Sequence, residues 1–436
     1  MFNLNGENLT LAVCLEEIKS SVGSSVTLNA CVHKVRQMSG FAFVILRTGR
    51  YVFQSVYSAD TCTDSIENVK EGCYVTVTGK VKEDKRANYG IEILLQTITV
   101  LSKPAADYPL HVSDRRLGCS IETNLDYRSV ALRNPFERAV FKLSEGIVSG
   151  FREFMLKEGF TEIHTPKIVS AGAEGGANIF KLKYFDKDAF LAQSPQFYKQ
   201  TCIAFFDRVF EIAPVYRAEK HNTSRHLNEY IGLDFEMGFI KDMGDVMNME
   251  TAMLKYVIHF LKENYENELT ITGAVLPVIT DIPVFSFFEA LEAIGSRPNK
   301  YDLDPEDEVK LCDYAKEKYG SEFVFITHYP ASKRPFYAMD NPENTKLAES
   351  FDLLFRGLEV TTGGQRIHSY EDQVAKMQSM GLNPEDFSSY LEAHKYGLPP
   401  HGGLGIGLER LAMKLLGLTN IRQSSLFPRD LTHLDP

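Results

Sequence analysis

The stretch VFEIAPVYRAEKHNTSRHLNEYIGLDFEM, residues 209–237, constrains the fold more than any other part of the sequence. Apolar and polar residues alternate along both halves, which predicts two antiparallel β-strands joined by the polar loop between them. The side chains expected on one face are Glu211, Ala213, Val215, Arg217 and Glu219 in the first strand and Tyr230, Gly232, Asp234 and Glu236 in the second. A wetted sheet face is the common alternative, but Gly232 leaves room above the sheet where such a face would carry a side chain.

Five short alternating segments near the N-terminus predict a small β-barrel, with the oligonucleotide-binding (OB) fold as the leading candidate. The segments are SVTLNACVHKV, FAFVILRT, YVFQSVYS, CYVTVTGKV and IEILLQTITV, between Ser25 and Thr99. A stretch with Pro104, Pro109 and Gly118 then breaks the pattern. We therefore expect an OB-fold domain over residues 1–104, a hinge or linker over 105–133 and a larger domain over 134–436.

A strong helix is expected at the start of the larger domain. Asn134 can cap it, Pro135 suits the first helical position, Glu137 completes a capping box, and Gly159 suits a left-handed end. Residues 285–335 indicate a helical insertion with a strand behind it. The segment GGLGIGLERLAMKLLGL indicates a glycine-rich strand running into a helix.

Composition excludes several classes of protein. The net charge of -11 argues against indiscriminate nucleic-acid binding, although a local patch can still bind RNA. The 7 cysteines form no C-x-x-C pair, so neither a disulfide framework nor a zinc knuckle is indicated. The sequence lacks an apolar run of membrane-spanning length and a signal peptide, so we expect a cytoplasmic protein that does not contact membranes.

Three motifs in the right order resemble the class II aminoacyl-tRNA synthetases, and the aspartyl-tRNA synthetases of archaeal and eukaryotic type in particular. GFTEIHTP resembles motif 1; VYRAE, RHLNEY and GLDFEM resemble motif 2; and GIGLERLAMKLLG followed by SLFPRD resembles motif 3. The resemblance covers nearly the whole chain. It implies an α+β fold, in which the OB-fold barrel precedes a catalytic domain with a mainly antiparallel sheet flanked by helices.

The resemblance implies an aspartate-tRNA ligase, which joins L-aspartate and ATP into aspartyl-adenylate and transfers the aspartyl group to tRNA(Asp). Such chemistry depends on positioning and charge stabilisation and needs no protein nucleophile. The implied catalytic residues are Arg217, Glu219 and Arg410. The implied ATP-binding residues are Arg217, Ala218, Glu219, Arg225, His226, Leu227, Tyr230, Glu359, Gly407, Leu408, Glu409 and Arg410. An asparaginyl-tRNA synthetase and a synthetase-like RNA-binding protein without catalysis are the alternatives.

The implied aspartate-binding residues are Glu174, Gln196, Lys199, Arg217, Asp234, Thr362 and Arg366. Arg366 and Lys199 suit a side-chain carboxylate, and Asp234 is expected to orient both cations. Glu174 and Gln196 are expected to receive the α-ammonium group. Because a neutral amide would leave Lys199 buried and unpaired, this pair of cations favours aspartate over asparagine.

The resemblance also implies a metal site, an RNA surface and a partner. Asp352, Glu359 and Thr362 are the expected Mg²⁺ ligands, since oxygen donors suit a hard cation; an acidic strand facing water is the alternative. Arg36, Phe43 and Gln54 are the expected anticodon-binding residues of the barrel, with Phe43 either stacking on a base or lying in the core. Motif 1 implies a homodimer.

Overall fold

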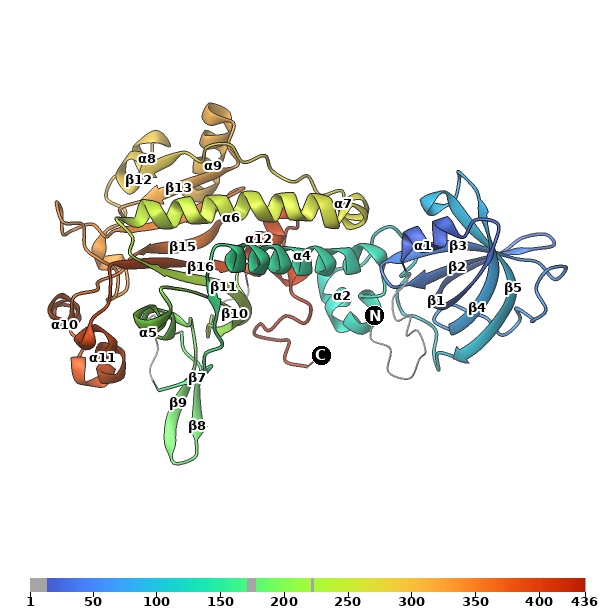
Figure 1. Ribbon diagram of the computed structural model, residues 1–436, viewed down its shortest axis with the longest axis horizontal. Helices are drawn as coiled ribbons and strands as arrows, with labels where there is room; N and C mark the ends of the chain where they lie inside the picture. The colour runs from blue at the N-terminus through green and yellow to red at the C-terminus, as the bar shows by residue number, and fades with distance from the viewer. Residues whose placement is uncertain (1–13, 171–177, 221–222, 436) are drawn as a thin grey trace. The chain divides into compact units, whose positions relative to one another are not determined.

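The computed structural model describes residues 14–170, 178–220 and 223–435 of the 436-residue chain. The chain forms two compact units that divide after Arg138. The first unit contains a β-barrel and the second contains an eight-stranded sheet with its covering helices (Figure 1). The predicted class, a barrel followed by a mainly antiparallel α+β domain, is confirmed.

The first unit is a closed five-stranded barrel with the strand order β1-β2-β3-β5-β4. The strands are β1 (Ser25–Gln37), β2 (Ala42–Thr48), β3 (Tyr51–Tyr57), β4 (Tyr74–Glu83) and β5 (Ile91–Ser102). Along β2, every second residue is buried, as the alternating sequence predicts. The inward set, which includes Val44, Leu46 and Phe53, forms a hydrophobic core with Ile18 from helix α1 (Leu15–Ser20).

The segment expected to be a linker contains two short helices, α2 (Ile121–Asp126) and α3 (Arg128–Ala131). Arg128 is buried and donates hydrogen bonds to Asn124, at 2.6 Å, and to Glu137, at 3.3 Å. Residues 105–133 are therefore more ordered than their prolines and glycines indicate, because a buried ion pair fastens them to the next helix.

The long helix α4 (Pro135–Lys157) begins and ends where its capping residues predict. Asn134 caps it, since its Oδ1 accepts the backbone N–H of Glu137 at 3.3 Å. Gly159 takes the left-handed conformation, with φ of +78°. The predicted capping box is wrong, because the Glu137 carboxylate pairs with Arg128 instead.

The second unit is built on one sheet with the strand order β12-β13-β14-β15-β16-β11-β10-β6. Every inner pair of strands is antiparallel, and only the two outermost pairs are parallel. The strands are β12 (Val284–Ser286), β13 (Phe323–Thr327), β14 (Ser350–Phe355), β15 (Glu359–Gln365), β16 (His401–Gly407), β11 (Glu229–Gly238), β10 (Arg208–Tyr216) and β6 (Thr161–Glu162).

Helices α4 and α6 (Met243–Asn264) lie side by side along this sheet (Figure 1). Gly146 allows the close contact, because a Cβ at this position would lie 2.6 Å from the side chain of Leu261. Glu250 of α6 accepts a hydrogen bond from Thr361 of β15, at 2.5 Å, so α6 covers the face to which Thr361 points. The next side chain along β15 points to the opposite face, where the candidate site lies.

The remaining elements surround the sheet. They are α5 (Gln196–Phe206), α7 (Glu266–Thr272), α8 (Phe287–Ala293), α9 (Pro305–Tyr319), α10 (Tyr370–Ser379), α11 (Ser388–Tyr396) and α12 (Leu408–Leu415), with a small sheet of β7 (Ile168–Val169), β8 (Lys181–Tyr184) and β9 (Lys187–Leu191). The expected insertion over 285–335 contains α8 and α9, but β12 and β13 extend the main sheet. Over the described part of the chain, no helix is both long and apolar enough to cross a membrane.

Candidate active site

The charged hairpin is formed by β10 and β11, and its faces are those expected. Ala213 pairs with Gly232 and Val215 pairs with Tyr230, so these side chains share one face. Glu211 shares this face but does not line the cavity above it. Its carboxylate accepts hydrogen bonds from Thr165, at 2.6 and 2.8 Å, and from Lys167, at 2.9 Å.

A cavity of about 360 Å³ lies above this hairpin. Arg217, just past the end of β10, and Arg410, on α12, both line it. The other predicted residues that line it are Gln196, Lys199, Glu219, Arg225, His226, Leu227, Tyr230, Asp234, Glu359, Thr362, Arg366, Gly407 and Glu409. Ala218, Leu408 and Asp352 do not line it, and Glu174 lies outside the described residues.

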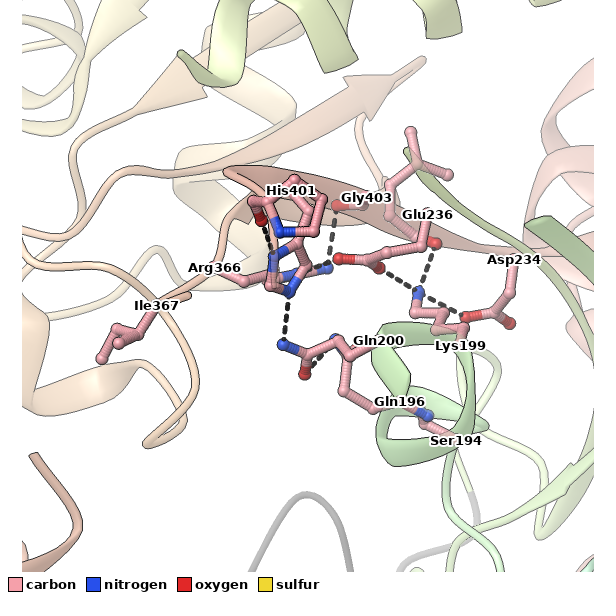
Figure 2. Close-up of polar contacts among 12 residues, drawn as sticks. Ser194, Gln196, Lys199, Gln200, Asp234, Glu236, Arg366, Ile367, His401 and Gly403 are labelled. Atoms are coloured by element: carbon pink, nitrogen blue, oxygen red, sulfur yellow. Dashed lines mark hydrogen bonds and ion pairs between the residues drawn. The ribbon is translucent and has the colours of Figure 1, made fainter. Parts of the chain in front are cut away.

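One end of the cavity is closed by a buried cluster of two cations and two carboxylates (Figure 2). The Lys199 ammonium donates to Asp234 Oδ1 at 3.0 Å and to the Leu404 carbonyl at 2.8 Å, and lies 3.4 Å from Glu236 Oε2. Arg366 donates from Nε to Glu236 Oε1 at 2.9 Å. The prediction that Asp234 orients both cations is therefore wrong for Arg366, because Glu236 is the carboxylate that contacts both.

The cluster pairs two cations with two carboxyl groups, but the pKa values of the two carboxyl groups shift in opposite directions. Burial would raise the pKa of Glu236, yet the nearby cations Arg366 and Lys199 outweigh it, so its pKa is lowered and it stays ionised. For Asp234 burial dominates and raises the pKa, because it outweighs the attraction of Lys199 and the carboxylates Glu211 and Glu236 act in the same direction as burial. The site therefore holds fixed positive charge at Arg366 and Lys199, beside one firmly ionised carboxylate.

We expect Glu236→Gln to lower the stability of the fold by about 3 kcal/mol, because it leaves two buried cations with a single carboxylate. Because the pKa of Glu236 is lowered in the folded state, its contribution is complete above the ordinary glutamate pKa and is lost as the pH falls through the folded value. Urea unfolding at pH 7 and pH 4 measures both effects.

The matched control is Glu263→Gln, which removes an exposed carboxylate paired with His259 on α6. This change should alter stability by no more than about 0.5 kcal/mol. Equal stability of the Glu236 variant and the wild type at pH 7 would contradict the account of the cluster.

A second layer of buried polar side chains supports this end of the cavity (Figure 2). Gln196 Nε2 donates to Gln200 Oε1 at 2.9 Å, and Gln200 Nε2 lies 3.0 Å from His401 Nε2. Burial lowers the pKa of His401 to about 4, so its ring is neutral and can accept this hydrogen bond. The sequence does not single out Gln200 or His401, although Gln200 lies one helical turn after Gln196, where a second polar residue on a buried helix face is unusual.

At the other end, the cavity is lined by arginines from the hairpin and from α12, namely Arg217, Arg225 and Arg410. Arg410 donates to Glu359 Oε1 at 3.1 Å and to the Glu359 carbonyl at 3.0 Å. His226 contacts Thr223 Oγ1 through Nδ1, at 2.7 Å, and burial beside Arg410 lowers its pKa, so its ring is neutral at pH 7. This end therefore suits an anion with several charges.

Glu409 links α12 to the hairpin. Its carboxyl accepts the backbone N–H of Ile231, at 3.1 and 3.3 Å, beside the cavity-lining Tyr230. Burial raises the pKa of Glu409 to about 7. The contact fixes the wall formed by Tyr230 relative to Arg410, so Glu409 acts on the shape of the cavity.

The expected metal ligands fit only in part. Thr362 and Glu359 line the cavity, with Thr362 Oγ1 at 3.4 Å from Glu359 Oε1. Asp352 pairs with Thr362 across β14 and β15, but it is buried and both its oxygens accept from Arg334, at 3.1 and 2.8 Å, so this arrangement does not support metal ligation by Asp352. No group of three or more His, Cys, Asp or Glu side chains that could hold a metal ion occurs among the described residues.

The three expected RNA-binding residues gather on the outer face of the barrel. Arg36 pairs with Phe43 across β1 and β2, and Ile45 pairs with Gln54 across β2 and β3. Phe43 is half-buried between inward-facing neighbours, so it belongs to the outer face and not to the core. Gln54 is held by a hydrogen bond to Glu92 at 3.2 Å.

Comparison with known proteins agrees with this geometry. Residues 120–431 match the family model "tRNA synthetases class II (D, K and N)" and residues 26–101 match that of the OB-fold nucleic acid binding domain. The chain belongs to the class II tRNA synthetases. The predicted family is confirmed, and the cavity lies where motifs 2 and 3 of this synthetase meet.

Similar proteins include both aspartate and asparagine enzymes. The chain is 43% identical to the aspartate--tRNA(Asp/Asn) ligase of Thermus thermophilus, covering 98% of this chain and 100% of the relative. It is 38% identical to the aspartate--tRNA(Asp) ligase of Pyrococcus horikoshii, covering 95% and 97%. Asparaginyl-tRNA synthetase from P. horikoshii, solved with asparaginyl-adenylate, superposes with a TM-score of 0.89 at 28% identity, covering 98% and 100%.

Proposed function

We propose that this synthetase is an aspartate-tRNA ligase. It activates L-aspartate with ATP to give aspartyl-adenylate and pyrophosphate, and then transfers the aspartyl group to the 3′ end of tRNA, releasing AMP. The observation that carries the proposal is the pair Lys199 and Arg366, buried at one end of a cavity whose other end holds Arg217 and Arg410. Cations at both ends suit one ligand with a carboxylate and another with phosphates.

The choice of aspartate over asparagine follows from charge. Lys199 is only 2% exposed, and because the pKa of Asp234 is raised, a substrate carboxylate adds negative charge to this cluster that a neutral amide cannot supply. Sites built on such polar matching can reject the wrong ligand by roughly 10⁴-fold. The relatives named for aspartate share 38% to 44% identity with the chain over nearly its whole length, which supports the same choice.

Catalysis is proposed to depend on orientation. Arg217 holds the α-phosphate and the attacking aspartate carboxylate, so that a carboxylate oxygen attacks phosphorus in line as pyrophosphate leaves. Glu219 recognises the adenine amino group, and Tyr230 and Arg410 stack on opposite faces of the ring. In the second step a hydroxyl of the tRNA terminus attacks the aspartyl carbonyl carbon, and AMP leaves.

Magnesium is proposed to accompany ATP. Glu359 and Thr362 would hold it, and when bound the ion neutralises charge on the phosphates. Glu359 also pairs with Arg410, at 3.1 Å, so this carboxylate sets the position of the arginine that is proposed both to stack on adenine and to touch the γ-phosphate.

Aminoacylation of purified tRNA(Asp) and tRNA(Asn), side by side and with either radioactive aspartate or radioactive asparagine, tests the proposal. Aspartate should be attached to tRNA(Asp). Aspartate on tRNA(Asn) as well would extend the substrate range to that named for the Thermus thermophilus relative. Binding of tRNA without any aminoacylation would favour the non-catalytic alternative, and attachment of asparagine alone would favour the asparaginyl alternative.

Phe43 on the barrel is proposed to stack on an anticodon base, so Phe43→Ala should weaken tRNA binding by about 1 to 3 kcal/mol, or roughly 5- to 150-fold. Aspartate-dependent pyrophosphate exchange should not change, because it needs no tRNA. Tyr74→Ala, an exposed aromatic on β4 of the same barrel, is the matched control. An unchanged Kd for tRNA in the Phe43 variant would remove this surface from the proposal.

The chain is also proposed to form a homodimer through motif 1, with α4 and the strand after it. Sedimentation at micromolar concentration should give twice the mass of 49.2 kDa. A monomer under these conditions would contradict the assignment of motif 1 as an interface.

A further inference from the structure

Helix α9 brings one carboxylate to the nucleotide end of the cavity. Glu308, in the first turns of α9, is 8% exposed. Its Oε2 accepts a hydrogen bond from Arg225 Nη2, in the loop of the hairpin, and another from the backbone N–H of Glu359, at 2.9 Å. A single buried oxygen therefore joins three separate elements: α9, the hairpin loop and β15.

Arg225 lines the cavity while its Nη2 is held by Glu308. A guanidinium group has five N–H donors, so one carboxylate contact leaves other donors for an anion in the cavity. Arginine side chains lose considerable rotamer freedom when they bind, and a fixed partner removes part of that loss in advance. The geometry therefore suits a residue that is held in place before its ligand arrives.

The neighbouring carboxylates in the same region pair with other arginines. Glu359 accepts from Arg410, and Asp352 accepts from Arg334. Among the described residues, Glu308 is the carboxylate that accepts a hydrogen bond from Arg225. The function of Glu308 is thus separable from those of the two predicted metal ligands.

We propose that Glu308 is a positioning residue that orients Arg225 toward the outer phosphates of ATP. The proposal rests on the proposed function, which supplies ATP as the nucleotide. Through Glu308, helix α9 of the insertion takes part in nucleotide binding although none of its own side chains lines the cavity. The hydrogen bond from the Glu359 N–H fixes the Glu308 carboxylate against β15. Its partner Arg225 is therefore held in one orientation.

Pyrophosphate exchange in a double-mutant cycle tests this proposal. Glu308→Ala should raise the KM for ATP about tenfold, while kcat and the KM for aspartate stay within about twofold. Arg225→Ala should raise the KM for ATP at least as much. The double variant should match Arg225→Ala alone, because Glu308 acts only through Arg225.

A control and a second variant keep the test decisive. Glu306→Ala removes an exposed carboxylate from the same turn of α9, paired with Lys310, and should leave the KM for ATP unchanged. Glu308→Gln keeps an acceptor for the Glu359 N–H and should raise the KM for ATP about threefold. If the alanine variant does not fold, the glutamine variant replaces it in the same double-mutant cycle with Arg225→Ala.

Additive effects in the double variant, an unchanged KM for ATP, or an equal rise in the KM for aspartate would each overturn the role of Glu308. Absence of aspartate-dependent exchange in the wild type would instead overturn the proposed function.

Discussion

Replacing Lys199 by methionine should lower kcat/KM for aspartate at least about 10³-fold in pyrophosphate exchange, the largest effect expected from any single change. The variant keeps the length of the side chain but removes one of the two cations that are proposed to bind the substrate carboxylate. Glu236 is then paired with Arg366 alone and Asp234 loses its cation, so the floor of the pocket attracts the substrate carboxylate less strongly. The KM for ATP should change little, since Arg217 and Arg410 are untouched.

Lys167→Met is the matched control. Lys167 also pairs with a buried carboxylate of the hairpin, Glu211, at 2.9 Å, but Glu211 lies outside the cavity. This variant should be less stable yet keep its KM for aspartate. If the Lys199 variant is folded by circular dichroism, binds ATP by calorimetry and activates aspartate as the wild type does, the assigned role of Lys199 is wrong.

Replacing Arg217 by lysine should lower kcat for adenylate formation by roughly 10²- to 10³-fold. Lysine keeps the charge but cannot hold the α-phosphate and the attacking carboxylate together through a planar fork of donors. Because these contacts strengthen in the transition state, the loss should fall on kcat and not on the KM for ATP. Single-turnover formation of aspartyl-adenylate measures this step directly.

Arg208→Lys provides the comparison for Arg217. Arg208 lies at the other end of β10 and donates to the Glu158 carbonyl at 2.9 Å, away from the cavity. Its replacement should leave adenylate formation within about twofold of the wild type. A kcat for the Arg217 variant within threefold of the wild type would show that charge alone suffices at this position.

Local patterns predicted the parts of the fold that local physics determines. The alternation of apolar and polar residues in β2 and in the hairpin correctly predicted which side chains share a face, since successive side chains of a strand point to opposite sides. Asn134 and Gly159 marked the ends of α4 because each satisfies a backbone requirement of a helix terminus. Motif order then predicted that Arg217 and Arg410 line one cavity.

Contacts between side chains that lie far apart in the chain could not be predicted from the sequence. Glu236 was placed on the correct face, but its contacts with both Lys199 and Arg366 depend on how β11, α5 and β15 come together. The same holds for Asp352, whose oxygens are taken by Arg334 from a neighbouring loop. The sequence around a carboxylate in a strand does not indicate whether the carboxylate will contact an arginine or a metal ion.

Short edge strands were missed for a related reason. β12 has 3 residues, too few for a period to be visible, and it joins the sheet by pairing with β13. The helices α8 and α9 lie within the expected helical insertion, and in the structure both begin with capping boxes.

Pyrophosphate exchange by the wild-type enzyme, driven by each amino acid in turn, tests the central claim most directly. Aspartate should drive exchange, and asparagine at the same concentration should give at most about 10⁻³ of that rate. Exchange driven by asparagine and not by aspartate would contradict the assignment of Lys199 and Arg366 to the substrate carboxylate.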